Sequence, residues 1–303
     1  MSKVASNNQA KLGRLALFLE KIFSSKFTPS FTKSLVKSLY FFLQDIRYYL
    51  FRGSNSMVPP PSYACIGFGN YEAIGKEFFG YFLDLANIKP NHQILDVGCG
   101  SGRLALPLTN YLSEEGSYYG FDIIKSEIDW AQKRISSRYP NFHFQHVDVN
   151  NNLYRKQAET KAENYEFPFK DESFDFIYLN SVFTHMLPQD IKNYIGEIER
   201  VLKPDGKCLI TFFLLNEESK EHIASGKSLI NFKYEVDGFL TNNNNTVEDA
   251  IALEEKMVRN FFDQAEMEIN GPIHYGSWSG RKKYLSFQDI LILKKRINSK
   301  TKD

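Results

Sequence analysis

The chain has 303 residues, of which 43% are hydrophobic and 24% are charged, and its formal net charge is +1. This composition is typical of a soluble globular protein with a sizeable core. The three cysteines are far apart and form no Cys-x-x-Cys pair, which excludes a disulfide framework and a cysteine zinc site and favours a reducing, cytoplasmic setting; no other metal site is predicted.

The charge is distributed unevenly. Residues 1–52 carry nine basic and two acidic residues, a net +7, and residues 281–303 carry a net +6. The body between them, residues 53–280, therefore carries −12. Phosphate contacts supply most of the affinity for nucleic acid, so an acidic body argues against a nucleic-acid substrate.

Residues 1–57 are predicted to form a helical, basic N-terminal extension. Apolar residues recur every three or four positions over 31–52, the pattern of an amphipathic helix. Two interpretations of residues 1–52 stay open: peripheral contact with an anionic membrane surface, or a helical cap on the main domain or a second subunit. No stretch there has the ~20 apolar residues of a membrane span. Three prolines at 59–61 mark a linker, and a catalytic domain is expected over 58–303.

From residue 71 onward, helix and strand patterns alternate. Helices are predicted over 71–86, 104–112, 128–139, 190–202 and 247–262, and strands over 94–97, 118–121, 142–147, 174–179, 208–215, 267–269 and 290–293. This order predicts an α/β fold with a doubly wound, mostly parallel sheet. We expect a core over 90–215, an inserted cap over 217–246, and a C-terminal helix and strands over 247–296.

Residues 94–103 read Ile-Leu-Asp-Val-Gly-Cys-Gly-Ser-Gly-Arg. The apolar run predicts a buried strand that ends in three alternate glycines where a helix begins. Such glycines let the backbone approach a ligand, and the N–H groups of the helix face it. A dinucleotide fingerprint would read Gly-x-Gly-x-x-Gly instead. The eight positions Leu95–Gly102 resemble motif I of the class I S-adenosylmethionine-dependent methyltransferases.

The resemblance implies a seven-stranded sheet with an antiparallel last strand, and S-adenosyl-L-methionine as the cofactor. Motif I would contribute Asp96, Gly98, Cys99, Gly100, Gly102 and Arg103, with Asp96 near the methionine amino group. Asp122, 20 residues after Gly102, can accept hydrogen bonds from both ribose hydroxyls, unless it only caps the next helix. Further contacts implied are Asp148 to the adenine amino group, Ile123 and Val149 to the adenine ring, and Asn180 and Ser181 in the methionine pocket.

Two histidines are candidate general bases. His185 follows the fourth strand, and the alternative is that it packs or caps the next helix. His274 lies in the glycine-rich segment 271–281, where Tyr275, Trp278 and Arg281 suit a sugar or an aromatic acceptor; a simple hairpin loop is the alternative. Tyr63, Phe68 and Tyr71 are expected either to cover the cofactor or to pack in the core.

The sequence therefore predicts a cytoplasmic methyltransferase that acts on a small-molecule, sugar or lipid-linked glycan acceptor, with O-methylation favoured. Asn180-Ser181-Val182-Phe183 is not the Asn/Asp-Pro-Pro-Tyr/Phe pattern of amide and base N-methyltransferases. Two alternatives stay open. One is an NAD-dependent oxidoreductase, because Asp122 also suits a nicotinamide ribose, and the other is a non-catalytic scaffold that binds S-adenosylmethionine.

Overall fold

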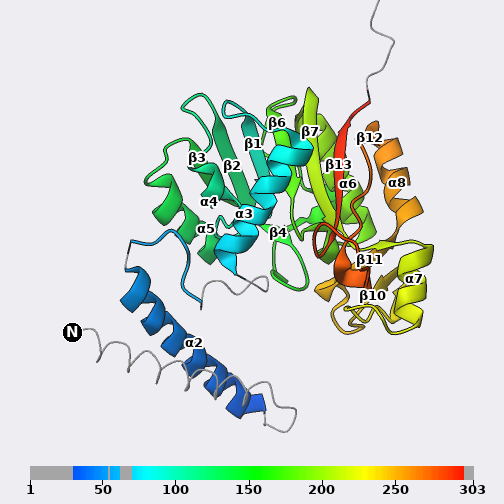
Figure 1. Ribbon diagram of the computed structural model, residues 1–303, viewed down its shortest axis with the longest axis horizontal. Helices are drawn as coiled ribbons and strands as arrows, with labels where there is room; N and C mark the ends of the chain where they lie inside the picture. The colour runs from blue at the N-terminus through cyan, green and yellow to red at the C-terminus, as the bar shows by residue number, and fades with distance from the viewer. Residues whose placement is uncertain (1–29, 54, 62–69, 297–303) are drawn as a thin grey trace, which may run out of the picture.

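The computed structural model describes residues 30–53, 55–61 and 70–296. A seven-stranded sheet with the order β12-β13-β7-β6-β1-β2-β3 crosses the molecule (Figure 1). Its strands are β1 (Gln93–Val97), β2 (Ser117–Asp122), β3 (Phe142–His146), β6 (Phe174–Leu179), β7 (Leu202–Phe212), β12 (Met267–Ile269) and β13 (Asp289–Lys295). The pairs among β3, β2, β1, β6 and β7 are parallel, and β13 is antiparallel to β7 and β12. The predicted fold class is confirmed.

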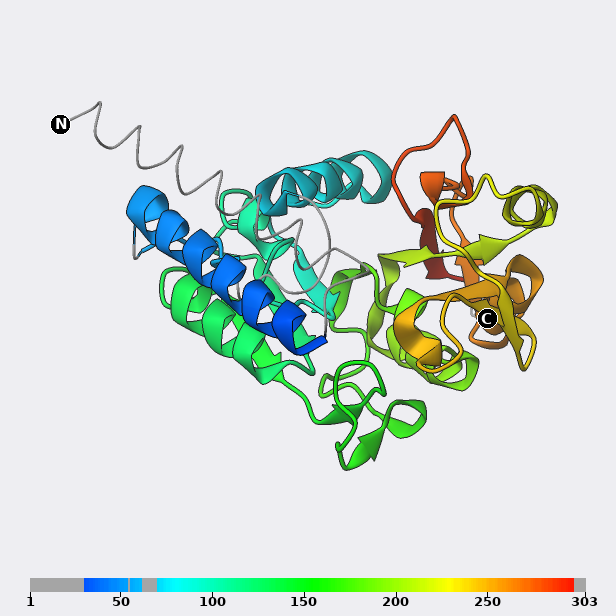
Figure 2. The same ribbon diagram turned by 90° about the horizontal axis from the view of Figure 1, so that it is seen from below.

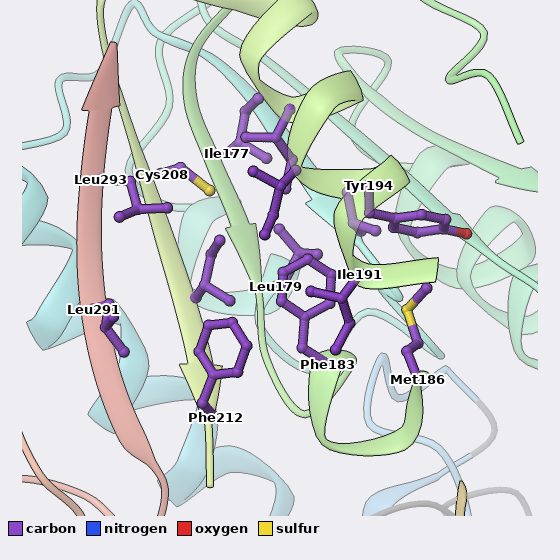
Figure 3. Close-up of a cluster of buried hydrophobic side chains, with 14 of the residues drawn as sticks. Ile177, Leu179, Phe183, Met186, Ile191, Tyr194, Cys208, Phe212, Leu291 and Leu293 are labelled. Carbon is purple, nitrogen blue, oxygen red and sulfur yellow. The ribbon is translucent and has the colours of Figure 1, made fainter. Parts of the chain in front are cut away.

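Helices cover both faces of this sheet. They are α3 (Tyr71–Tyr81) continued by the π-helical turn η1 (Phe82–Ala86), α4 (Ala105–Leu108), α5 (Lys125–Ala131) continued by η2 (Gln132–Ser136), α6 (Pro188–Val201) and α8 (Glu255–Gln264). Successive side chains of β1 point to opposite faces of the sheet, and each face packs against its own layer of helices. Ile94 faces the apolar cluster of α3, α4 and α5, whereas Leu95 and Val97 face the cluster of α6 and α8. Part of the second cluster is drawn in Figure 3.

The cap differs from its prediction. It contains α7 (Glu217–Ala224) and a four-stranded sheet, β8-β11-β10-β9, made of β8 (Leu214–Leu215), β9 (Tyr234–Val236), β10 (Phe239–Thr241) and β11 (Ile251–Glu254). The prediction of a helix over 247–262 is wrong for the first half of that range. Those residues form a 3₁₀ turn, η5 (Val247–Asp249), followed by β11. Residues 251–253 are buried between β8 and β10, and this pairing overrides the helical periodicity.

Short elements complete the chain: β4 (Val149–Asn150), β5 (Thr160–Lys161), and the 3₁₀ turns η3 (Ala162–Asn164), η4 (Phe183–His185) and η6 (Ser277–Ser279). The helix predicted over 104–112 is also shorter than expected, because regular α-helix is confined to the four residues of α4.

The predicted amphipathic helix is α2 (Ser30–Arg52). Its C-terminal turn is tied to the body, since Arg52 pairs with Glu72 and the Tyr48 hydroxyl donates to the carbonyl of Val58. Figure 2 shows α2 at the opposite end of the molecule from the cap. Within residues 30–53, 55–61 and 70–296, no helix is both long enough and apolar enough to cross a bilayer.

Candidate functional site

The glycine turn between β1 and α4 leaves no room for side chains. Gly98, Gly100 and Gly102 have φ values of +78°, +51° and +87°, which L-residues with a Cβ rarely adopt. A Cβ at Gly98 would lie 2.5 Å from Cγ2 of Val182, and one at Gly102 would lie 2.6 Å from Cδ1 of Ile135. The turn therefore requires glycine at these positions for two independent reasons, backbone conformation and space.

Asp122 joins this turn to the start of α5. Its Oδ2 accepts the N–H of Gly100 at 2.8 Å, and its Oδ1 accepts the N–H of Ile124 at 2.8 Å. Burial raises the pKa of Asp122, and these N–H groups oppose the rise by stabilising the charged form. The N-cap residue of α5 is Ile124, so the alternative that Asp122 itself caps this helix is not supported. Each carboxylate oxygen keeps a second lone pair for a ligand hydroxyl.

Sequence reasoning missed Glu127, which lies over the same turn. Its side chain is buried at 6% exposure and is hydrogen-bonded to the backbone and hydroxyl of Ser101. A Cβ at Gly100 would lie 2.9 Å from Oε2 of Glu127. Burial raises the pKa of Glu127 to about 7, and the nearby charge of Asp122 adds to the shift. An acid in the first turn of the helix after Asp122 was the available signal.

Asp96 lies beneath the turn, on the face of β1 toward α3 and α4. Its Oδ2 accepts the hydroxyls of Tyr118 at 2.7 Å and Tyr178 at 2.9 Å. Burial raises the pKa of Asp96 to about 7, and the two hydroxyls counteract this rise. Burial also raises the pKa of the neighbouring Cys99 thiol, so Cys99 is not an activated nucleophile.

At the other end of the site, Asp148 faces a cation. The Nε of Arg155 donates to its Oδ1 at 2.7 Å, and this bond lowers the pKa of Asp148. His146 lies next to both predicted cofactor acids: it pairs with Asp122 in the β2–β3 register and precedes Asp148 by two residues. Its Nε2 is buried and has no hydrogen-bond partner in the described part of the chain. This nitrogen is therefore available to a ligand, and sequence reasoning did not single it out.

The remaining predicted contacts lie at the carboxyl ends of β2, β3 and β6. Val149 is buried and Ile123 packs against the same apolar cluster. Asn180 is half-buried at the end of β6. Ser181 has a left-handed φ of +61°, its N–H donates to Oγ1 of Thr211 at 2.8 Å, and its Oγ accepts from Nε2 of Gln288 at 2.8 Å.

The hydrogen bond of His185 fixes a tautomer in which Nε2 can accept a proton. Its Nδ1 lies 2.9 Å from the carbonyl oxygen of Glu248. A carbonyl only accepts, so Nδ1 carries the proton and the neutral ring keeps a lone pair on Nε2. Burial lowers the pKa of His185, which favours this neutral form. The ring of Tyr154 lies edge-on, with centroids 5.8 Å apart.

His185 lies in η4, directly after the carboxyl end of β6, with Tyr154 against its ring. Burial raises the pKa of the Tyr154 hydroxyl, and the charges of Asp249, Asp122 and Glu127 raise it further. The structure therefore brings one of the two candidate bases to the same edge of the sheet as the predicted cofactor residues.

In the second predicted cluster, segment 271–281, Trp278 and Arg281 are both buried and hydrogen-bonded within the protein. Trp278 is fully buried, and its indole donates to Oδ2 of Asp289 at 2.9 Å, so it presents no face to a ligand, contrary to expectation. Arg281 is 7% exposed and donates to Glu218 and Asn216 at 2.9 Å each.

Two residues of that segment border a cleft. The Tyr275 hydroxyl donates to Oε2 of Glu255 at 2.8 Å. The backbone of His274 pairs with Ile290, and its side chain lines the cleft together with that of Tyr275. The structure thus places His274 on the cleft wall beside β13 and His185 in η4 after β6.

Tyr71 lies against the glycine turn. Its hydroxyl donates to the carbonyl oxygen of Ser101 at 3.2 Å, and the guanidinium of Arg103 lies 5.2 Å from its ring centre. Tyr63 and Phe68, named with it, lie outside the described residues. Among the residues that the structure describes, no group of three or more His, Cys, Asp or Glu side chains is arranged to hold a metal ion.

Comparison with known proteins gives consistent matches. Residues 88–270 match the family model described as "Methyltransferase domain". The 2-phytyl-1,4-naphtoquinone methyltransferase of Trichormus variabilis is 31% identical over 125 residues, 41% of this chain and 48% of that protein. The arsenite methyltransferase of Mus musculus is 28% identical over 172 residues, 56% of this chain and 44% of that protein. The chain thus spans about half the length of the curated relatives it matches.

Among solved structures, the PH0226 protein of Pyrococcus horikoshii OT3 superposes with a TM-score of 0.54 at 17% identity. The superposition covers 82% of this chain and 99% of that protein. At this identity the likeness shows a shared fold.

Proposed function

The chain belongs to the class I S-adenosylmethionine-dependent methyltransferases, and from this premise we propose that it methylates a hydroxyl group of a small-molecule, sugar or lipid-linked glycan acceptor. The observation that carries the choice of a hydroxyl is the contact of His185 Nδ1 with the carbonyl oxygen of Glu248, which leaves the lone pair of the neutral ring on Nε2. A hydroxyl nucleophile gains from a general base, whereas an already ionised acceptor does not.

The described residues fit S-adenosylmethionine. The glycine turn offers a surface that a Cβ would fill, and His146 leaves a buried nitrogen unpaired within the described chain. Asp122 would hold the ribose hydroxyls. We assign the other contacts as follows: adenine to Ile123, Asp148 and Val149, and the methionine end to Asp96, Asn180 and Ser181. Asp148 already pairs with Arg155, so an adenine amino group would share that carboxylate. When bound, S-adenosylmethionine supplies an electrophilic methyl group on a sulfonium sulfur.

The protein's own residues then have three tasks. Asp122 and the turn glycines orient the bound groups, because their backbone contacts fix one conformation. Tyr71 covers the glycine turn and limits the access of water. His185 takes the proton of the acceptor hydroxyl at Nε2 while its Nδ1–H stays bonded to the Glu248 carbonyl, which keeps the ring oriented. A pKa below the ordinary value suits an acidic hydroxyl, such as a phenol or a quinol, best.

Two alternatives to this proposal are an NAD-dependent oxidoreductase and a non-catalytic scaffold. The family match identifies S-adenosylmethionine as the cofactor, and it does not favour the nicotinamide hypothesis. The relatives include a 2-phytyl-1,4-naphtoquinone methyltransferase and an arsenite methyltransferase, so the acceptor varies among similar proteins. The proposed hydroxyl acceptor therefore rests on the site of this chain.

Calorimetric titration with S-adenosylmethionine, S-adenosylhomocysteine and NAD, followed by assays of S-adenosylhomocysteine release, tests the proposal. We expect binding of the first two ligands, no binding of NAD, and turnover with hydroxyl-bearing acceptors such as quinols and glycosides. Tight binding without turnover on any acceptor would favour the scaffold hypothesis, and methylation only at carbon, nitrogen or arsenic would contradict the hydroxyl assignment.

We also propose that the basic N-terminal extension contacts an anionic membrane surface. Leu39, Phe42 and Leu50 lie on one side of α2 and are 47%, 60% and 68% exposed, so the described body does not cover this apolar stripe. The net charge of +7 over residues 1–52 complements anionic lipid.

Sedimentation with vesicles provides the test. Full-length protein is expected to sediment with phosphatidylserine-containing vesicles and not with phosphatidylcholine alone. Deletion of residues 1–52 should abolish sedimentation and leave S-adenosylmethionine binding intact. If the deletion gives no folded protein, the extension is part of the core and the membrane proposal loses its basis.

A further inference from the structure

A cleft of ≈ 970 Å³ lies outside the glycine-turn site, between α7 and the segment that follows β12. Figure 2 shows α7 (yellow) beside this orange to red segment at one end of the molecule. Six basic or ionisable nitrogen side chains line the cleft: His222, Lys227, His274, Arg281, Lys282 and Lys283. The volume is within the range of small-molecule sites, roughly 300–1,000 Å³.

The charges on this cleft are largely uncompensated. Lys227, Lys282 and Lys283 are exposed, and their ammonium groups make no ion pair or hydrogen bond with any residue that the structure describes. The acid on the cleft wall is Glu218, and Arg281 already binds it. With neutral histidines the lining carries a net charge of +3. The body over residues 53–280 carries −12, so this concentration of positive charge stands against its surroundings.

Hydrogen bonds hold the side chains at the floor of the cleft in fixed positions. Arg281 is held from several sides, by Glu218, by Asn216 and by the Oγ of Ser279 at 3.0 Å. The Nδ1 of His222 lies 3.0 Å from the carbonyl oxygen of Ser279, so Nδ1 carries the proton and Nε2 remains available. The cleft therefore combines a fixed guanidinium with three lysines that have freedom to adjust to an anion.

The same segment connects the cleft to the methyl-transfer site. Leu285 lines the cleft, and its carbonyl accepts the Tyr81 hydroxyl of α3 at 2.7 Å. Three residues later, Gln288 donates to Ser181 at the end of β6. Three residues span at most about 10 Å, so the backbone of the cleft wall at Leu285 lies within that distance of Gln288, the residue that binds Ser181.

We propose that the cleft binds a phosphate or diphosphate group of the acceptor. This deepens the proposed function and rests on it, because it assigns the acceptor to the organic phosphate esters. Several ammonium groups around one guanidinium suit a multiply charged group with many acceptor oxygens better than a single carboxylate. Two sources carry this chemistry, a soluble nucleoside diphosphate ester and a lipid-linked diphosphate.

The test uses full-length protein and inorganic pyrophosphate as the probe, titrated by calorimetry at low ionic strength. The double variant Lys282→Glu/Lys283→Glu removes two ammonium groups from the cleft. The matched control Lys133→Glu/Lys170→Glu makes the same change in net charge at exposed lysines that lie outside the cleft. The cleft variant is expected to weaken pyrophosphate binding by about ten- to a hundred-fold. The control should bind as the wild type does, and all three proteins should bind S-adenosylmethionine equally.

Two further probes then distinguish the two sources: free uridine diphosphate and vesicles that contain phosphatidic acid. The control variant shows how much vesicle binding is due to the N-terminal extension. Loss of uridine diphosphate binding in the cleft variant alone supports a soluble acceptor, and a selective loss of vesicle binding supports a lipid-linked one. Wild-type protein that binds S-adenosylmethionine but not pyrophosphate, or equal losses in both variants, would overturn the cleft assignment alone. Failure to bind S-adenosylmethionine would instead count against the proposed function.

Discussion

Replacing His185 with alanine is expected to lower turnover by about 100- to 10,000-fold, the usual contribution of a general base, while S-adenosylmethionine binding changes little. The reason is the bonding of the ring. Its Nδ1–H is committed to the carbonyl of Glu248, and Nε2 is the nitrogen left for the acceptor. Burial lowers the pKa of His185, so the base form is present at neutral pH.

The pH profile separates catalysis from packing. A base acts only when it is deprotonated. The wild-type rate should therefore be constant at neutral and higher pH, and it should fall at a pH below the ordinary histidine pKa of about 6.5, because the pKa of His185 is lowered. His185→Ala should lose that acidic limb together with its activity. His143→Ala is the matched control, because His143 is an exposed histidine of β3 that is assigned to neither the glycine-turn site nor the basic cleft. Unchanged turnover in His185→Ala, with the same pH profile, would remove the base assignment.

Asp122→Ala is expected to weaken S-adenosylmethionine binding by about 1 to 3 kcal/mol, or roughly 5- to 150-fold, because hydrogen bonds to a buried charged group are lost. The variant also removes the acceptor of the Gly100 and Ile124 N–H groups, which hold the turn against α5. Calorimetric titration at a temperature where both proteins are folded measures the change.

Asp129→Ala is the control for this substitution. Asp129 is an exposed acid of α5 that pairs with Lys125 on the surface, so its removal changes the charge of the same helix without touching the turn. Its affinity for S-adenosylmethionine should match that of the wild type. Equal affinity in Asp122→Ala and the wild type would contradict the ribose assignment, and equal weakening in both variants would point to a general charge effect.

The glycine turn shows what a local pattern can establish. Gly98, Gly100 and Gly102 follow an apolar strand, and all three have positive φ values at positions where a Cβ would clash. β6 covers the predicted residues 174–179, and β13 adopts the antiparallel pairing that the family resemblance implied. These features depend on side-chain alternation, on glycine and on chain order, all of which are visible in a short window of sequence.

The cap shows where local pattern fails. Residues 247–254 have helical periodicity, but their pairing with β8 and β10 makes a strand of their second half. Trp278 was expected at a binding surface, and the structure buries it against Asp289 of β13. Burial by distant segments decided these outcomes, and no window of sequence contains that information.

The sequence by itself determined the α/β fold, the position of the glycine turn and the acids around it, because strand alternation, glycine backbone freedom and motif spacing are local properties. Only the tertiary structure decided which other groups meet there. Glu127 covers Gly100, His146 lies beside the two predicted acids, and Glu248 fixes the tautomer of His185 across 63 residues of chain. The basic cleft likewise forms because packing brings residues 218–227 against 273–285, and charges that far apart in sequence acquire a common function only when the core fixes the distance between them.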